Sequence, residues 1–369
     1  MKKLEKSVPV IRFKGFSEAW EQRKFIEIIN RLSKTSNSSI LPKVEYEDII
    51  AEEGRLNKDI SNKFDSRKGI LFQPKNILYG KLRPYLKNWL YPDFKGVAVG
   101  DFWVFEAIEA TPRFIYNLIQ SDSYQKVAND TAGTKMPRSD WTKVSNSSFF
   151  IPKESSEQKR IGTFFKQLDD TIALHQRKLD TLKQMKKGLL QQMFPKSEED
   201  VPKIRFADFD EEWYQRKLGE EFEKINERND GSFGKTHWIS VAKMYFVEPN
   251  KVLSNNIDTR TYVMRKGDIA FEGHSNTDFK FGRFVANDIG PGIVSELFPV
   301  YRHKTNYDNN YWKNAIQLEH IMAPIYSKSI TSSGNSSNKL DSKHFLNQKI
   351  YIADFEEQEK IGSIFKQLD

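Results

Sequence analysis

The chain contains an internal repeat, and this repeat limits the folds that it can adopt. Residues 8–24 and 201–217 are identical at 11 of 17 positions, at a constant offset of 193. Residues 157–169 and 357–369 are identical at 9 of 13 positions, at an offset of 200. Matches this dense indicate two similar halves. We call these four segments the frame blocks.

The sequences between the frame blocks differ from each other. Residues 26–154 and 219–354 share little sequence, although they follow corresponding blocks. This layout is typical of a scaffold that presents two different recognition elements. A duplicated domain with ordinary divergence is the alternative, but divergence of that kind would not leave the identity in sharp blocks.

Residues 155–194 give the clearest helix signal. Apolar or nearly apolar positions recur at alternating spacings of four and three, which is the heptad pattern of a coiled coil. These positions are Ile161, Phe165, Leu168, Ile172, His175, Leu179, Leu182, Lys186, Leu189 and Met193. A helix of about 40 residues is roughly 60 Å long. We interpret His175 and Lys186 as register or packing residues, not as metal ligands.

The second copy of this helix begins in the same way. Ser155 with Gln158, and Asp354 with Glu357, are typical of capping boxes. Ile361, Phe365 and Leu368 then repeat the heptad positions, which makes this helix the natural partner of the central one. The second copy reaches only Asp369, where the first continues for about 25 residues more. Either it is truncated or the natural form is short, and we expect oligomerisation or instability of the isolated chain.

Both inserts predict the same order of elements, and the fold class that we expect is α+β. In the first insert we predict strands at 69–72, 76–79, 96–99, 101–105 and 149–151, and a helix at 114–127. In the second we predict strands at 268–271, 283–285, 292–294, 298–301 and 349–352, a helix at 311–325, and a polar loop at 331–339.

Basic and amide side chains gather where loops are expected in both inserts. Such side chains bind phosphates and base edges, although each alone is more often an ordinary surface residue. The candidate DNA-binding residues are Lys81, Arg83, Lys87, Thr134, Lys135 and Arg138 in the first insert, and Asn276, Lys280, Arg283, Asn335, Asn338 and Lys339 in the second.

Composition is compatible with a polyanionic partner and offers no catalytic centre. The formal net charge is +8, which favours such a partner only weakly. There is no cysteine, so disulfides and cysteine-based zinc sites are excluded. No nucleotide-binding, methyltransferase or hydrolase motif is recognisable, and we predict no metal site. No export signal or long apolar run is present, so we expect a cytoplasmic location and no membrane partner.

The frame blocks, the NILYGKLRPYL segment and the two helix starts resemble the specificity subunits of type I restriction–modification systems, over essentially the whole chain. The resemblance implies two target-recognition domains at 1–154 and 196–353, a long helix at 155–195, and the start of a second helix at 354–369. It implies that the long helices separate the domains as a coiled coil with a pseudo-twofold repeat.

The resemblance also implies a function and partners. The chain would be a non-catalytic subunit that binds double-stranded DNA at a two-part site. It would bind no cofactor itself; two methyltransferase subunits would bring S-adenosylmethionine, and restriction subunits would bring ATP and Mg. The expected subunit-docking residues on the central helix are Phe165, Leu168, Ile172, Leu179, Leu182 and Leu189. There are two alternatives. An enzyme with an unrecognised motif would show cleavage or methyl transfer in assays of the purified protein, and an interaction scaffold that binds no DNA would give no gel shift.

Overall fold

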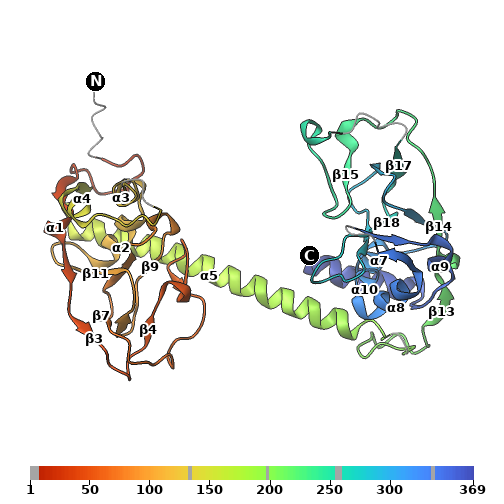
Figure 1. The fold of residues 1–369 in the computed structure, drawn as a ribbon, viewed down its shortest axis with the longest axis horizontal. Coiled ribbons are helices and arrows are strands. Elements are labelled where there is room, and N and C mark those ends of the chain that lie inside the picture. Colours follow the sequence, from red (N-terminus) through yellow and green to blue (C-terminus); the bar gives the residue numbers. More distant parts are fainter. Residues whose placement is uncertain (1–7, 132–134, 197–198, 254–259, 334–336) are drawn as a thin grey trace. The chain divides into compact units, whose positions relative to one another are not determined.

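A computed structural model describes residues 8–131, 135–196, 199–253, 260–333 and 337–369. The chain divides into two compact units, Met1–His175 and Gln176–Asp369. The boundary between them falls within one continuous helix, α5 (Ser155–Gln192), which is visible in Figure 1. The long helix expected from the heptad pattern is therefore confirmed.

The elements of unit 1 are short strands and short helices before α5 (Figure 1). Its strands are β1 (Glu21–Lys24), β2 (Ile29–Leu32), β3 (Thr35–Ser36), β4 (Lys43–Val44), β5 (Ile49–Ile50), β6 (Arg55–Leu56), β7 (Gly69–Phe72), β8 (Ile77–Gly80), β9 (Trp89–Leu90), β10 (Gly96–Ala98), β11 (Phe102–Ala107) and β12 (Ser148–Ile151). Its helices are α1 (Phe25–Ile28), α2 (Pro112–Gln120), α3 (Asp122–Ala128) and α4 (Trp141–Asn146), with 3₁₀ turns η1 (Tyr46–Asp48) and η2 (Pro84–Leu86).

The central sheet of unit 1 is buried on both faces. It is antiparallel with the order β2-β11-β8-β9, and a second sheet has the order β3-β7-β10-β4. Successive residues of β11 point to opposite faces. Trp103 and Phe105 join the core cluster that includes helix α2, whereas Phe102 and Val104 join the cluster that includes residues of the second sheet. The sheet is thus the middle layer of the unit.

Unit 2 is similar to unit 1 in the order of its main elements, but the two units do not match strand for strand. Its strands are β13 (Tyr214–Lys217), β14 (Phe222–Ile225), β15 (Ile239–Ser240), β16 (Tyr245–Phe246), β17 (Thr261–Met264), β18 (Ile269–Glu272), β19 (Arg283–Ala286), β20 (Gly292–Ser295), β21 (Val300–His303), β22 (Ile330–Ser333), β23 (Asn338–Leu340) and β24 (Lys349–Ile352). Its helices are α6 (Leu218–Glu221), α7 (Asn309–Ala315), α8 (Glu319–Ser329), α9 (Ser342–Asn347) and α10 (Phe355–Leu368), with η3 (Lys235–His237) and η4 (Pro249–Lys251).

The central sheet of unit 2 is also covered on both faces. Its order is β14-β21-β18-β19. Ile269, Phe271 and Tyr301 belong to the cluster built with α7, α8 and α10, while Ala270 and Val300 belong to the cluster on the other face. The strands β14, β21 and β18 of unit 2 thus correspond to β2, β11 and β8 of unit 1.

A two-stranded ribbon closes each insert. β1 pairs antiparallel with β12, with Lys24 opposite Ser148. β13 pairs in the same way with β24, with Lys217 opposite Lys349. Both first strands come from the repeated frame blocks, so the repeat in sequence is a repeat in structure.

The α+β class is confirmed, and the predicted strands agree with the structure to within one or two residues. The two insert helices were predicted as continuous and this is wrong. The first is broken at Ser121, whose hydroxyl accepts a hydrogen bond from the Tyr124 N–H (3.4 Å) and caps α3. The second is divided into α7 and α8 by residues 316–318. The loop predicted at 331–339 is wrong at both of its ends, because residues 331–333 belong to β22 and residues 338–339 belong to β23. Among the described residues, no helix combines the length and apolar character that a membrane span requires.

Candidate nucleic-acid interface

In unit 1, two segments far apart in sequence lie side by side at one end of β8. Residues 81–87 follow β8, and residues 135–139 precede α4. The backbone N–H of Arg83 donates to the Pro137 oxygen (2.7 Å), and that of Ser139 donates to the Lys81 oxygen (2.8 Å). Leu82 and Arg138 form a β-bridge. The structure therefore unites the two groups of basic residues that the sequence singled out in this insert.

The basic side chains of this surface are only partly neutralised. Lys81 and Arg138 share one carboxylate, that of Asp101, at 3.6 and 3.1 Å. Lys87 forms an ion pair with Glu52 (3.1 Å).

Two further cations lie beside them. Arg83 and Lys135 are exposed, and no ion pair joins either to another described residue. Thr134, also predicted here, lies outside the described residues. The surface has an excess of positive charge in positions where a phosphate or a base edge can approach.

In unit 2, the corresponding two segments also meet. Residues 273–282 follow β18, the counterpart of β8, and the backbone N–H of Asn338 donates to the Gly273 oxygen (2.9 Å). Lys339 is exposed beside Asn338 on β23. Asn335 lies outside the described residues.

The other predicted residues of unit 2 are engaged within the protein. The Asn276 side-chain oxygen accepts from the N–H groups of Asp278 and Phe279 (both 2.9 Å), so it holds the turn. Arg283 donates to the Ala242 oxygen (2.6 Å) and lies over the Phe279 ring at 4.7 Å. The ammonium of Lys280 lies 5.6 Å from the centroid of the neighbouring Phe281 ring. We therefore assign Asn276 and Arg283 a role in shaping the loop.

The predicted docking residues on α5 differ in accessibility. Phe165, Leu168, Ile172 and Leu179 are exposed, with fractions between 42% and 66%. Leu182 is half-buried, and Leu189 packs against the core of unit 2. The first four are available to a partner, whereas Leu189 stabilises its own unit.

Sequence reasoning missed the residues that anchor each unit to its helix. Arg12 donates two hydrogen bonds to the buried Glu157 carboxylate, both 2.7 Å, and Trp20 Nε1 donates a third (3.2 Å). In unit 2, Arg205 (2.8 and 2.9 Å) and Trp213 (3.0 Å) donate to Glu357 in the same way. The signal was present, because all six residues are identical between the frame blocks.

Gln158 and its counterpart Gln358 link each helix start to the insert. The Gln158 side chain accepts from the Thr111 N–H (2.8 Å) and donates to the Pro152 oxygen (2.9 Å). The capping box predicted for Ser155 and Gln158 is therefore wrong. At the second helix, Asp354 does cap the Glu357 N–H (2.8 Å), but the Glu357 side chain turns to Arg205 instead of the helix end.

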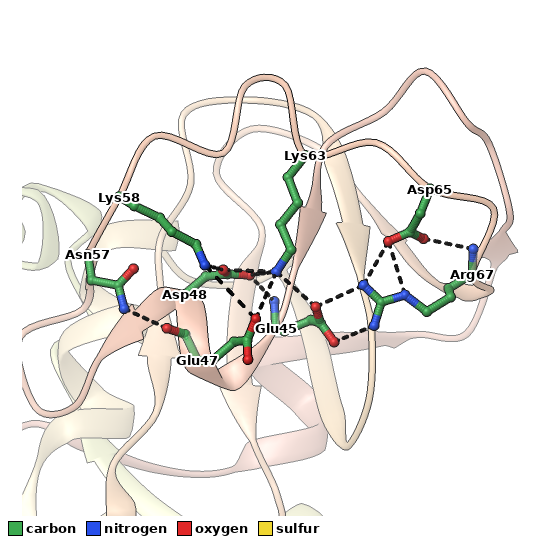
Figure 2. Close-up of polar contacts among 8 residues, drawn as sticks. All are labelled: Glu45, Glu47, Asp48, Asn57, Lys58, Lys63, Asp65 and Arg67. Atoms are coloured by element: carbon green, nitrogen blue, oxygen red, sulfur yellow. Dashed lines mark hydrogen bonds and ion pairs between the residues drawn. The ribbon is translucent and has the colours of Figure 1, made fainter.

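A network of charged side chains orders the segment after β4 in unit 1, as Figure 2 shows. Lys63 contacts Asp48 (2.7 Å) and Glu45 (2.8 Å), Lys58 contacts Asp48 (3.0 Å), and Arg67 joins Glu45 to Asp65. Burial alone would raise the pKa of Asp48, but hydrogen bonds from Lys63, the Glu45 N–H and Lys58 lower it. Hydrogen bonds from Arg67 bring the pKa of Glu45 down to about 2. The network is internally paired, so we interpret it as structural.

Comparisons with known proteins agree with this architecture. Residues 17–184 match the family described as the type I restriction modification DNA specificity domain. No curated protein matches the chain in sequence.

Among the described residues, no group of three or more His, Asp or Glu side chains could hold a metal ion.

Two solved structures share the fold of nearly the whole chain. One is the S subunit of a type I restriction–modification system from M. genitalium, with a TM-score of 0.57, 14% identity, and coverage of 99% of this chain and 92% of that one. The other comes from work on complex assembly and conformational transition of the type I R-M system, with a TM-score of 0.52, 16% identity, and coverage of 98% and 91%. At these identities the likeness shows a common fold.

Proposed function

We propose that this chain, whose residues 17–184 match the type I restriction modification DNA specificity domain, reads a two-part DNA site and directs methyltransferase and restriction subunits to it. Each unit reads one part of the site. The chain itself carries out no chemistry; methyl transfer from S-adenosylmethionine and ATP- and Mg-dependent restriction belong to its partners.

The observation that carries the proposal is the equivalent pairing of loops in the two units. In unit 1, the segment after β8 is hydrogen-bonded to the segment before α4, through the Arg83 N–H and the Pro137 oxygen. In unit 2, the segment after β18 is hydrogen-bonded to the segment before α9, through the Asn338 N–H and the Gly273 oxygen. The frame around these loops is repeated, but the loop residues are not. Two surfaces of different chemistry on the same scaffold suit the recognition of two different half-sites.

The charges of the unit 1 surface support binding to DNA. Lysine and arginine side chains that contact phosphates release counterions and give affinity without sequence selectivity. An arginine that reaches a base edge can bind the O6 and N7 atoms of guanine with two hydrogen bonds. Arg83, which is exposed, has the accessibility for such a contact.

The test is a change of specificity in one half-site only. The chain is expressed with its methyltransferase partners, and methylated positions are mapped across a genome. Replacing Arg83 and Arg138 together by alanine is expected to relax or abolish recognition of the half-site read by unit 1 and to leave the other unchanged. Lys126→Ala, an exposed cation on α3, is the matched control. An unaltered two-part motif in the double variant would contradict the assignment of this surface.

A further inference from the structure

The turn that follows β8 is held in a costly backbone conformation. Arg83 (φ 49°, ψ 62°) and Lys87 (φ 54°, ψ 46°) both adopt the left-handed region, which residues other than glycine rarely occupy. They flank the 3₁₀ turn η2, whose first residue, Pro84, is buried. Strained positions of this kind persist where surrounding contacts enforce them, and they gather at functional sites.

The surrounding contacts are present here. The Arg83 N–H donates to the Pro137 oxygen (2.7 Å), the Leu86 N–H to the Arg83 oxygen (2.8 Å), and the Lys87 N–H to the Pro84 oxygen (2.9 Å). These hydrogen bonds therefore hold the projecting turn in one conformation and attach it to residues 135–139.

The side chains that this projection presents are apolar. Tyr85 is 55% exposed and Leu86 is 40% exposed. Met136, which directly precedes Pro137, is 49% exposed. We call these three residues the apolar tip. Single exposed apolar residues are ordinary, but three on two hydrogen-bonded segments require an explanation.

The cations around the apolar tip define what it can bind. Lys81, Arg83, Lys135 and Arg138 lie on the same two segments, and the first and last of them share a single carboxylate. DNA can satisfy both the cations and the apolar tip. Its phosphates are anionic, and the C5-methyl group of thymine is the apolar group that base edges present in the major groove.

The corresponding loop of unit 2 lacks such a tip. Its aromatic residues Phe279 and Phe281 are half-buried and lie beneath the cationic groups of Arg283 and Lys280. That loop therefore presents charge where the loop of unit 1 presents apolar surface.

We infer that the apolar tip formed by Tyr85, Leu86 and Met136 contacts thymine methyl groups in the major groove and makes thymine a specified base of the half-site read by unit 1. The inference rests on the proposed function and adds to it the chemistry of one readout.

The experiment replaces thymine by deoxyuridine, which removes only the methyl group. The full chain is first used to select its DNA site from random sequences, and each thymine in each half-site is then substituted in turn. Deoxyuridine at the contacted position is expected to weaken binding by about fourfold, which corresponds to one buried methyl group. In the Tyr85→Ala/Leu86→Ala/Met136→Ala variant, thymine and deoxyuridine are expected to bind equally. Tyr245→Ala, which removes an exposed tyrosine of unit 2, is expected to keep the difference.

Three results would overturn the inference. They are a unit 1 half-site without thymine, equal binding of thymine and deoxyuridine by the unaltered chain, and an unchanged preference in the triple variant. If equal binding is accompanied by a sharp DNA bend that the triple variant loses, the tip acts as a wedge between base pairs instead. In each of these cases DNA binding itself persists and the proposed function stands. Failure of the unaltered chain, alone and with its methyltransferase partners, to bind any DNA sequence would refute both.

Discussion

The Arg12 guanidinium and the Glu157 carboxylate, 145 residues apart in sequence, are joined by two hydrogen bonds of 2.7 Å. The equivalent pair in unit 2, Arg205 and Glu357, has the same geometry. A charge-assisted pair of this kind fixes both distance and orientation. Each pair therefore sets the position of a helix start relative to the frame block that precedes the insert.

Removal of the Glu357 carboxylate is expected to destabilise unit 2 strongly. Glu357 is buried and accepts bonds from Arg205 and Trp213, so Glu357→Ala leaves two donors without their partner. Breaking a buried pair from one side costs about 3 kcal/mol. Urea unfolding measures the loss, and Glu356→Ala at the exposed neighbour is the control. The effects of Glu357→Ala and Arg205→Ala should not be additive; additivity would show that the two residues act independently.

The same substitution at two helical glycines is expected to have opposite effects. A Cβ at Gly362 would overlap the Asp308 carboxylate, which caps α7 through the Tyr311 N–H (2.7 Å). Gly362→Ala should therefore cost about 2 kcal/mol, from overpacking and loss of the cap. Gly188 in α5 has no heavy atom within 4 Å of such a Cβ, so Gly188→Ala should stabilise by roughly 0.5–1 kcal/mol. Thermal unfolding of the two variants tests the signs, and equal signs would contradict this packing at Gly362.

His303 is expected to make stability depend on pH. Burial lowers the pKa of His303 to about 3, whereas an unfolded histidine has a pKa of about 6.5. The unfolded state therefore binds the proton first, and the folded state is destabilised as the pH falls below about 6.5 towards 3. Between pH 7 and 5.5 this amounts to about 1 kcal/mol. His303→Phe should reduce the pH dependence of the free energy of unfolding by that amount. An unchanged pH dependence would show that the His303 imidazole is exposed to water in the folded state.

Lys63→Met is expected to loosen the segment shown in Figure 2. Lys63 bridges Asp48, whose side chain is fully buried, and Glu45. Without Lys63, the buried carboxylate keeps only Lys58 as a cationic partner in this network. Hydrogen exchange of residues 45–67 should accelerate. Lys68→Met, at an exposed cation nearby, should leave the exchange unchanged, and a similar acceleration in both variants would argue against a specific role for the network.

Lys339→Met is expected to lower the salt dependence of DNA binding. Lys339 is exposed beside Asn338 on the unit 2 surface. Loss of one phosphate contact reduces the slope of log affinity against log salt concentration by about 0.9. Lys328→Met, on the exposed side of α8, is the control. Equal slopes for Lys339→Met and the unaltered chain would remove Lys339 from the interface.

Strand and helix periodicity in short segments predicted the long helix α5 and the inner strands of both central sheets, but not the outer strands β2 and β14 or the short helices α1 and α6. The break at Ser121 was missed since apolar residues continue on both sides of it, and the capping hydrogen bond of one hydroxyl leaves no periodic trace. The hydrogen bonds that the Asn276 side chain accepts from its own turn, and the one that Arg283 donates to the Ala242 oxygen, were missed for a different reason. A lone polar residue in a loop has the same sequence appearance whether it faces solvent or holds the backbone.

The ribbons β1–β12 and β13–β24 have a consequence for how inserts can be exchanged between related chains during evolution. The insert of unit 1 begins just after Lys24, and near its end the chain comes back to Ser148, which lies directly opposite Lys24. The second insert does the same between Lys217 and Lys349. Residues paired across antiparallel strands have Cα atoms about 5 Å apart. An insert of any length whose ends meet at that spacing can replace the resident one without stretching the scaffold. Recombination at the ribbon could exchange a whole insert as a cassette and leave the Arg–Glu anchors intact.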